Sequence, residues 1–210
     1  MKQGLILCLM VVAVALVSCS RSPKVETIVS DSDYTSTQTV AVMPFKNETL
    51  DVEAGELTRL FWALAMDQRG FEVQNIETTD ELLRSMGVTL GEHLDGIDRE
   101  ELADALGTDA LAFGVLKEAS YKTLVVAKKI SAAVEVEVWS EGRTRWQRRG
   151  SHSSTALMNP VDGFARGVVD KFFENAFKKY YGHPMFNMLE VVVIKMKEGL
   201  PGEEEEWTGW

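Results

Sequence analysis

The sequence predicts an α/β domain in which helices cover a mixed β-sheet. Its first half alternates short apolar segments with stretches of helical periodicity, the βαβ pattern that produces parallel strands. Its middle alternates between apolar and charged residues, which is typical of an antiparallel hairpin. The predicted strands are residues 39–45, 71–76, 109–126, 130–140 and 143–151.

Four helices are predicted around these strands. Leu57, Leu60, Phe61 and Leu64 recur at helical spacing, and Gly70 is a natural stop. A second helix is predicted at residues 78–87, with a Thr or Asp cap and Gly87 at the end. A third is predicted at residues 98–107, with Asp98 as cap and Gly107 as stop. The fourth is predicted at residues 159–182, where Pro160 begins it and Gly182 ends it. The predicted inner stripe of the last helix is Val161, Phe164, Val168, Phe172 and Ala176.

The hairpin at residues 130–151 has a predictable register. A three-residue loop within "SEGR" would place Val138 opposite Trp146 and Glu135 opposite Arg149. This register pairs apolar with apolar and acid with base, as cross-strand neighbours prefer. We therefore expect Trp146 to be buried against the valine face of the preceding strand.

The N-terminus has the pattern of a bacterial lipoprotein signal. Lys2 is followed by an apolar run from Leu5 to Val17, which is too short to span a bilayer and suits a secretory signal peptide of residues 1–18. Leu16, Val17 and Ser18 before Cys19 resemble a lipobox, which predicts lipidation of Cys19 and firm anchoring. Ser20 favours the outer membrane. The alternatives are an ordinary signal peptide or an uncleaved anchor.

Composition suggests three parts after the signal peptide. Residues 19–37 are polar and rich in Ser and Thr and are predicted to be a flexible, lipid-anchored tether. Residues 38–184 form the single α/β domain, and residues 185–210 form a C-terminal extension with an acidic tail. The formal net charge of −10 argues against a nucleic-acid partner. Cys8 leaves with the signal peptide, so no disulfide is expected.

Several segments resemble a family of small lipoproteins of Gram-negative bacteria. These segments are "VAVMPFKNET", "GFEVQNIETTDELLRSMG", "LADALGTDALAFGVLKEASYKT" and "VEVEVWSEGRTRWQRRGSHSS", and the resemblance covers about residues 38–182. The family is catalogued as a domain of unknown function. The resemblance implies a fold similar to the N-terminal domain of TolB. Members of the family are often encoded beside CsgG-like lipoproteins, which makes a CsgG-like lipoprotein a candidate partner. The resemblance implies no catalytic residues.

No reaction centre is predicted. His93, His152 and His183 are far apart and lack metal-ligand spacing, so each is expected at the surface, and no metal or cofactor is predicted. The acidic pairs Asp80/Glu81 and Glu100/Glu101 lie in predicted first helical turns, where the helix dipole favours them.

Two features are candidate partner-binding sites. The first is the basic hairpin, defined as Arg143, Arg145, Arg148 and Arg149, with Lys128 and Lys129 nearby. The alternative is an ordinary solvated strand face whose charges pair with Glu135 and Glu137. The second is the tail "GEEEEWTGW", in which Trp207 and Trp210 could anchor a linear peptide in a groove of another protein; the alternative is a dispensable end.

These observations favour a non-enzymatic lipoprotein in the outer membrane, facing the periplasm. Its predicted role is that of an accessory or structural component of an envelope secretion or transport assembly, acting through binding to other envelope proteins. The alternative is a periplasmic protein that binds a small ligand, or a hydrolytic enzyme that acts on cell-wall material. A polar cleft with convergent carboxylates would favour the alternative, and a surface with one apolar or charged patch would favour protein binding.

Overall fold

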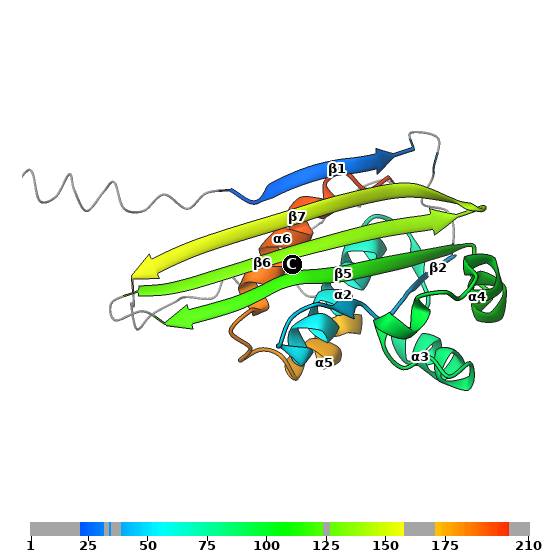
Figure 1. Cartoon of the computed structure of the whole chain (residues 1–210), viewed down its shortest axis with the longest axis horizontal. Coiled ribbons are helices and arrows are strands. Elements are labelled where there is room, and N and C mark those ends of the chain that lie inside the picture. The colour runs from blue at the N-terminus through cyan, green and yellow to red at the C-terminus, as the bar shows by residue number, and fades with distance from the viewer. Residues whose placement is uncertain (1–21, 32–33, 35–38, 124–126, 158–170, 202–210) are drawn as a thin grey trace, which may run out of the picture.

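A seven-stranded mixed sheet forms the centre of the molecule, with helices on both sides (Figure 1). The computed structural model describes residues 22–31, 34, 39–123, 127–157 and 171–201. The strands are β1 (Lys24–Ser30), β2 (Thr39–Val42), β3 (Lys46–Asn47), β4 (Glu72–Val73), β5 (Ala110–Thr123), β6 (Ala127–Ser140) and β7 (Arg143–Leu157). The helices are α2 (Val52–Asp67), α3 (Ile76–Ser85), the 3-10 helix η1 (Gly91–Leu94), α4 (Arg99–Leu106), α5 (Lys171–Lys178) and α6 (Phe186–Lys197).

The topology confirms the predicted fold class. The strand order is β1-β7-β6-β5-β2-β4, with β3 beside β5. β2 is parallel to both β4 and β5, as the βαβ pattern predicts, and β5, β6 and β7 are antiparallel to one another. The segment between β5 and β6, residues 124–126, is Leu-Val-Val in the sequence and lies outside the described residues.

Short polar side chains cap the N-termini of α2, α3 and α4. Asp51 caps α2 by accepting a hydrogen bond from the Ala54 amide, and Asp98 caps α4, as predicted. The cap of α3 is Asn75 rather than the predicted Thr or Asp, and the helix therefore starts earlier, at Ile76. Gly107 ends α4 with φ of 65°, a left-handed conformation that suits glycine.

The β6–β7 hairpin has the predicted register but a different turn. Val138 lies opposite Trp146, and Glu135 lies opposite Arg149. The turn contains two residues, Glu141 and Gly142, both with positive φ, in place of the expected three-residue loop. A register shift next to Val138 compensates for the shorter turn, so that the pairing predicted from side-chain chemistry still holds.

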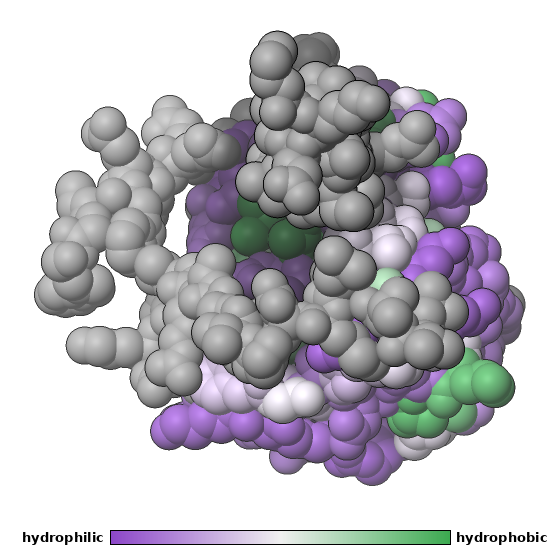
Figure 2. Space-filling model, turned by 90° about the vertical axis from the view of Figure 1, so that its left-hand side faces the viewer, coloured by the Kyte–Doolittle hydropathy of each residue, from purple (hydrophilic) through white to green (hydrophobic). Residues whose placement is uncertain are grey.

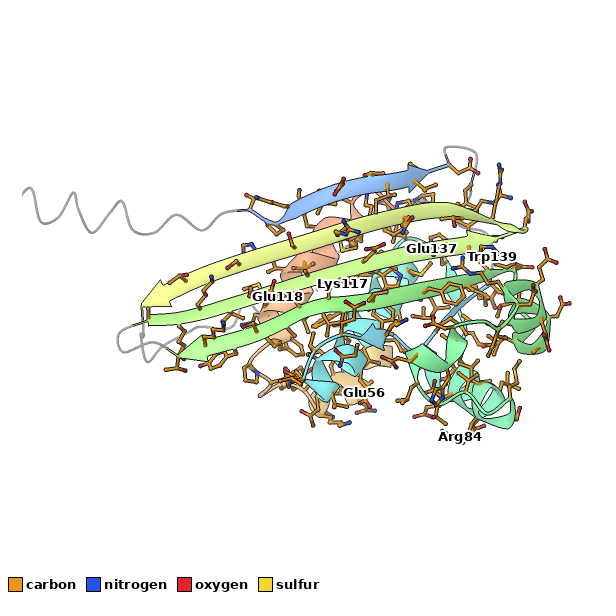
Figure 3. The ribbon with its side chains drawn as sticks, viewed as in Figure 1. Glu56, Arg84, Lys117, Glu118, Glu137 and Trp139 are labelled. Atoms are coloured by element: carbon orange, nitrogen blue, oxygen red, sulfur yellow. The ribbon has the colours of Figure 1, made fainter. Side chains whose placement is uncertain are left out.

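The two faces of the sheet are covered unequally. One face packs against α2, α5 and α6 and contains the larger core, with Val134, Val136 and Trp146 fully buried. The other face packs against α3 and α4 only near β2 and β5, through residues such as Met43 and Trp139. Figure 3 shows Lys117, Glu118 and Glu137 on this second face, which is turned toward the viewer with α2 and α6 behind the sheet.

The folded part begins earlier than predicted. Residues 24–30 lie within the segment predicted as a flexible tether, yet they form β1 at the edge of the sheet, antiparallel to β7. Val25 packs against the larger core, and the Asp31 amide donates a hydrogen bond to the Arg145 carbonyl. The composition of this segment is polar because most of this edge strand is exposed, so it has few apolar residues to reveal it.

The folded part also ends later than predicted. Residues 186–197, within the predicted C-terminal extension, form α6, whose Leu189, Val192 and Met196 are buried in the larger core. The helix approaches β7 closely, because a Cβ atom placed on Gly150 would lie only 2.5 Å from the Met196 sulfur. Residues 38–184 alone therefore would leave part of the sheet uncovered.

The predicted helix at residues 159–182 is described only from residue 171 onward. Within this part α5 ends at Lys178, Ala176 is exposed, and Phe177 and Tyr180 are buried, so the inner stripe lies one residue later than predicted. Val161, Phe164 and Val168 lie outside the described residues. Within the described chain, no helix is both long enough and apolar enough to cross a membrane.

Candidate functional site: a pocket at the carboxyl end of β2

The basic hairpin is engaged in contacts within the protein. Arg145 is buried and binds Asp31 at 2.9 Å, and Arg143 binds the same carboxylate at 3.1 Å. Arg149 binds Glu135 at 2.7 Å, and its hydrogen bond to this carboxylate raises the pKa of Arg149 above its ordinary value. The structure therefore brings the predicted arginines together along β7, but it pairs them with carboxylates.

Arg148 points to the opposite face from Arg149. Its Nη1 donates to the Met196 carbonyl oxygen at 3.2 Å, and burial lowers its pKa. The two buried or half-buried arginines, Arg145 and Arg148, thus hold distant parts of the chain together, which differs from the partner-binding role predicted for them. A partner role for the exposed Arg143 and Arg149 stays a prediction. Cys19, Trp207 and Trp210 lie outside the described residues.

A pocket of about 350 Å³ lies where β2 ends. In open α/β sheets, ligands often bind beyond the carboxyl ends of parallel strands. Five separate segments form the wall. They are the residues after β2, α2, α3, the η1 region and the segment after α5, and they contribute Pro44, Phe45 and Asn47; Val52, Gly55, Glu56, Arg59 and Leu60; Ile76 and Asp80; Thr89 to Glu92; and Tyr180, respectively. Because the wall combines segments that are distant in sequence, no local motif could reveal it.

Arg59 is the buried cation of the pocket wall. Its Nε and Nη2 atoms donate to the Val42 carbonyl oxygen at 3.0 and 2.7 Å, and its Nη1 donates to Asp80 at 2.7 Å. Burial lowers the pKa of this guanidinium, and the Asp80 carboxylate opposes that change. The group therefore fixes the end of β2 against α2 and α3, and its charge is already balanced.

Glu56 forms a second paired group, three residues before Arg59 on the same face of α2. Its carboxylate accepts hydrogen bonds from Tyr180 at 2.5 Å and from Lys179 at 3.1 Å. The hydrogen bond from Tyr180 is the main cause that lowers the Glu56 pKa. The carboxylate is therefore ionised at neutral pH and has no proton to donate, which argues against a role as general acid.

The exposed part of the pocket is apolar. Val52 and Leu90 line it and are 74% and 56% exposed, and Leu50, in the loop before α2, is fully exposed. Figure 2 shows a hydrophobic patch at the lower right of the surface, among hydrophilic surroundings. Exposed apolar groups that surround a pocket are typical of protein or ligand contact sites.

One histidine differs from the expected surface position. The His183 side chain is largely buried; its Nε2 lies 3.2 Å from Asp51, and its Nδ1 accepts a hydrogen bond from the Met185 amide. His183 therefore connects the start of α6 to the cap of α2, which is a structural role. His93 is exposed, as predicted. Within the described ranges, no group of His, Cys, Asp and Glu side chains could hold a metal ion.

The fold and the predicted lipidation signal define a class of small α/β envelope lipoproteins. A family model described as "Putative lipoprotein GNA1162-like" matches residues 30–180, and the chain belongs to this family. This confirms the resemblance found in the sequence, and the family is one of lipid-anchored envelope proteins. No curated protein sequence matches the chain.

Two solved structures show the same fold. A PelC dodecamer from Paraburkholderia phytofirmans has a subunit that is 15% identical, with coverage of 86% of this chain and 99% of that chain and a TM-score of 0.51. Lipoprotein GNA1162 from Neisseria meningitidis is 16% identical, with coverage of 71% of this chain and 98% of that chain and a TM-score of 0.50. At this identity the likeness describes the fold alone.

Proposed function

We propose that the protein is a non-enzymatic accessory lipoprotein, acylated at Cys19 in the outer membrane and facing the periplasm. It binds other envelope proteins in a secretion or transport assembly, and a CsgG-like lipoprotein is the first candidate partner. Lipidation is supported by the lipobox-like residues before Cys19 and by family membership. The binding surface is the apolar rim of the pocket, made of Leu50, Val52 and Leu90.

We choose the apolar rim as the binding surface because of the contacts that the charged groups of the pocket already make. Three charged groups of the pocket wall are in ion pairs, Arg59 with Asp80 and Glu56 with Lys179 beside the pocket, and Glu92 accepts a hydrogen bond from the Asn47 amide. The apolar side chains at the opening face solvent. Covering exposed apolar groups is favourable by roughly 25 cal/mol for each Å² buried. An apolar side chain of a partner could enter the pocket without breaking any of these ion pairs.

The second candidate function is binding or hydrolysis of cell-wall material. The presence of Glu56, Asp80 and Glu92 in the wall keeps this alternative open, because pockets with several carboxylates are common in hydrolases. The lowered pKa of Glu56 and the ion pair of Asp80 favour protein binding instead. Incubation with peptidoglycan fragments tests the alternative, since bond cleavage or a ligand-dependent rise in Tm would favour it.

The main test is crosslinking and affinity capture from intact cell envelopes. We expect Val52→Glu/Leu90→Glu to reduce partner recovery by roughly 30-fold, as the loss of interface anchors does. A glutamate at residue 52 lies in the first turn of α2, where the helix dipole tolerates it. The matched control is Val191→Glu/Ile194→Glu, which changes two exposed apolar residues of α6.

The control variant should retain its partners. Equal recovery of every partner by the wild type and by the pocket variant would overturn the proposed surface. Circular dichroism and urea unfolding of each variant show whether a loss of recovery reflects unfolding.

A further inference from the structure

The free ends of β5, β6 and β7 extend past the helices that cover the sheet (Figure 1). We call this end the ribbon tip and define it by Lys122 and Thr123 on β5 and by Lys128 and Lys129 on β6. Lys122 lies directly opposite Lys129, and Thr123 lies opposite Lys128. Because consecutive strand residues point to opposite faces, lysine side chains leave the ribbon tip on both faces.

The lysines of the ribbon tip have no carboxylate partner within the described part of the chain. Elsewhere, Lys117 binds Glu48 and Lys195 binds Glu198, both within 3 Å. The nearest carboxylate along β5 is Glu118, which accepts a hydrogen bond from Ser131. Like charges directly opposite each other on neighbouring strands destabilise a sheet. The Lys122–Lys129 pair therefore destabilises the sheet locally, and a bound anion would offset this repulsion.

The chain enters the sheet from the side of the ribbon tip. β1 is antiparallel to β7, so its N-terminal end is directed toward the ribbon tip (Figure 1), and its first residue, Lys24, lies opposite Ser151, four residues before the Thr155 that pairs with Lys129. Lys24 is exposed, and it too has no carboxylate partner among the described residues. It is the fifth residue after Cys19. Five residues span at most about 18 Å even when fully extended.

This short connection limits how far the domain can move from a lipid attached to Cys19. Within that limit, several orientations toward the bilayer remain. The net charge of −10 would orient most of the surface away from anionic headgroups. The ribbon tip carries the opposite sign, and Lys24 adds a positive charge on the side from which the chain enters the sheet.

We propose that the ribbon tip docks, end-on, on the anionic phospholipid headgroups of the membrane that holds the lipid anchor. The contact is made by Lys122, Lys128 and Lys129, and it rests on the proposed lipidation of Cys19 for its proximity. Lysines on both faces of the ribbon suit an end-on contact, whereas a face-on contact would use only one face. The opposite end, near Glu137 and Trp139 in Figure 3, then points away from the membrane.

Two further observations fit this orientation. Tyr121 is next to Lys122 and is 42% exposed, and Tyr is a residue that favours the membrane–water interface. Lys122, Thr123 and Lys129 are exposed as well, so their side chains are accessible to headgroups. Exposed lysines with no carboxylate partner among the described residues suit contact with anionic headgroups.

The first test measures vesicle binding without the lipid. The mature chain with Cys19→Ser is sedimented with vesicles of three parts phosphatidylethanolamine to one part phosphatidylglycerol, in about 0.05 M salt, where screening is weak. We expect Lys122→Gln/Lys129→Gln to bind at least about tenfold more weakly than the unchanged lysines, since each lysine contributes about fivefold. The matched control is Lys117→Gln/Lys195→Gln, which removes the same charge from paired lysines.

The second test uses the lipidated protein in the same vesicles. Single cysteines that carry a fluorophore replace Thr123 at the ribbon tip or Glu141 at the opposite turn, and the quencher is attached to the headgroups. We expect at least about twofold stronger quenching at residue 123 than at 141, and loss of this difference in Lys122→Gln/Lys129→Gln, because charge sets the orientation.

The outcomes separate this inference from the proposed lipidation. Equal quenching at the two positions, or an equal loss of vesicle binding in the control variant, would overturn end-on docking and leave the lipid anchor intact. Loss of a captured protein with unchanged vesicle binding would also overturn it, because the lysines would then serve a protein partner. Mass spectrometry of the mature protein tests acylation of Cys19 independently.

Discussion

The two ends of the ribbon formed by β5, β6 and β7 use positive charge in opposite ways. At the β6–β7 turn, Arg143 and Arg145 share the Asp31 carboxylate, so that end is neutralised from within. At the ribbon tip, Lys122 and Lys129 face each other without a carboxylate among the described residues. Both ends are basic in the sequence. The difference shows that whether a basic side chain is free to bind a partner depends on which carboxylates the fold places beside it.

The largest expected effect tests the core beneath the paired end. Trp146 is fully buried, stacks on Trp62 with a centroid distance of 5.3 Å, and donates its indole N–H to the Gly199 carbonyl oxygen at 2.7 Å. We expect Trp146→Ala to lower the free energy of unfolding by about 3–5 kcal/mol in urea titrations. A loss below about 1 kcal/mol would contradict this packing. Trp146→Phe, which keeps a ring, should lose less.

The next effect tests the ion pairs of the paired end. Asp31→Ala leaves the buried Arg145 with Glu141 as its remaining carboxylate, so we expect a loss of about 2–4 kcal/mol in the free energy of unfolding. Arg143→Gln removes the exposed partner of the same carboxylate and should cost less than about 1 kcal/mol. Equal losses in the two variants would show that the ion pair of the buried Arg145 stabilises the fold no more than that of the exposed Arg143.

A smaller effect of opposite sign is expected at the ribbon tip. Lys122→Gln/Lys129→Gln removes a like-charge pair, so the free energy of unfolding should rise by a few tenths of a kcal/mol, roughly 0.2–0.5. Added salt should reduce this gain, since it screens the repulsion in the wild type. A clear destabilisation would mean that these lysines are paired in the folded protein, as the arginines at the other end are.

The smallest effect concerns Glu56, which binds Lys179 and Tyr180 beside the pocket. Its carboxylate is more exposed than the guanidinium of Arg145. The folded-state pKa of Glu56 is lowered, mainly by the hydrogen bond from Tyr180, so its stabilising contribution is present above the unfolded pKa. That contribution is lost as the pH falls through the lowered pKa. Glu56→Gln should therefore flatten the pH dependence of Tm on the acid side and leave Tm at neutral pH slightly lower. An unchanged acid-side slope would contradict the assignment.

Local side-chain chemistry made the hairpin predictable. The opposite pairs Val138–Trp146 and Glu135–Arg149 depend on residues that are close in sequence, and their register was correct although the turn differs. β1 and α6 were missed because their contacts are distant in sequence. β1 pairs with β7, and the "LEVVVIKM" run of α6 is rich in β-branched residues, which favour strands unless tertiary packing decides.

The candidate site was less predictable than the fold. The pocket combines α2, α3, the η1 region and Tyr180, so its geometry exists only after folding. The sequence did indicate a cluster of basic residues, but it could not show that Asp31 would neutralise Arg145, because β1 was not predicted. Among the described residues, the lysines of the ribbon tip lack the carboxylate partners that the arginines have. This difference depends on tertiary contacts, which the sequence alone does not show.

The pairing of β1 with β7 also has a mechanical consequence. Force that reaches the domain through its N-terminus acts on Lys24, along the axis of the strand. Six rows of residues, from Lys24 opposite Ser151 to Ser30 opposite Trp146, then bear the load in shear rather than opening one after another. The last row leads to the Asp31–Arg145 ion pair beside the core. A pull from the membrane side is therefore resisted by the whole edge of the sheet at once, and the domain can carry tension between its point of attachment and whatever it holds.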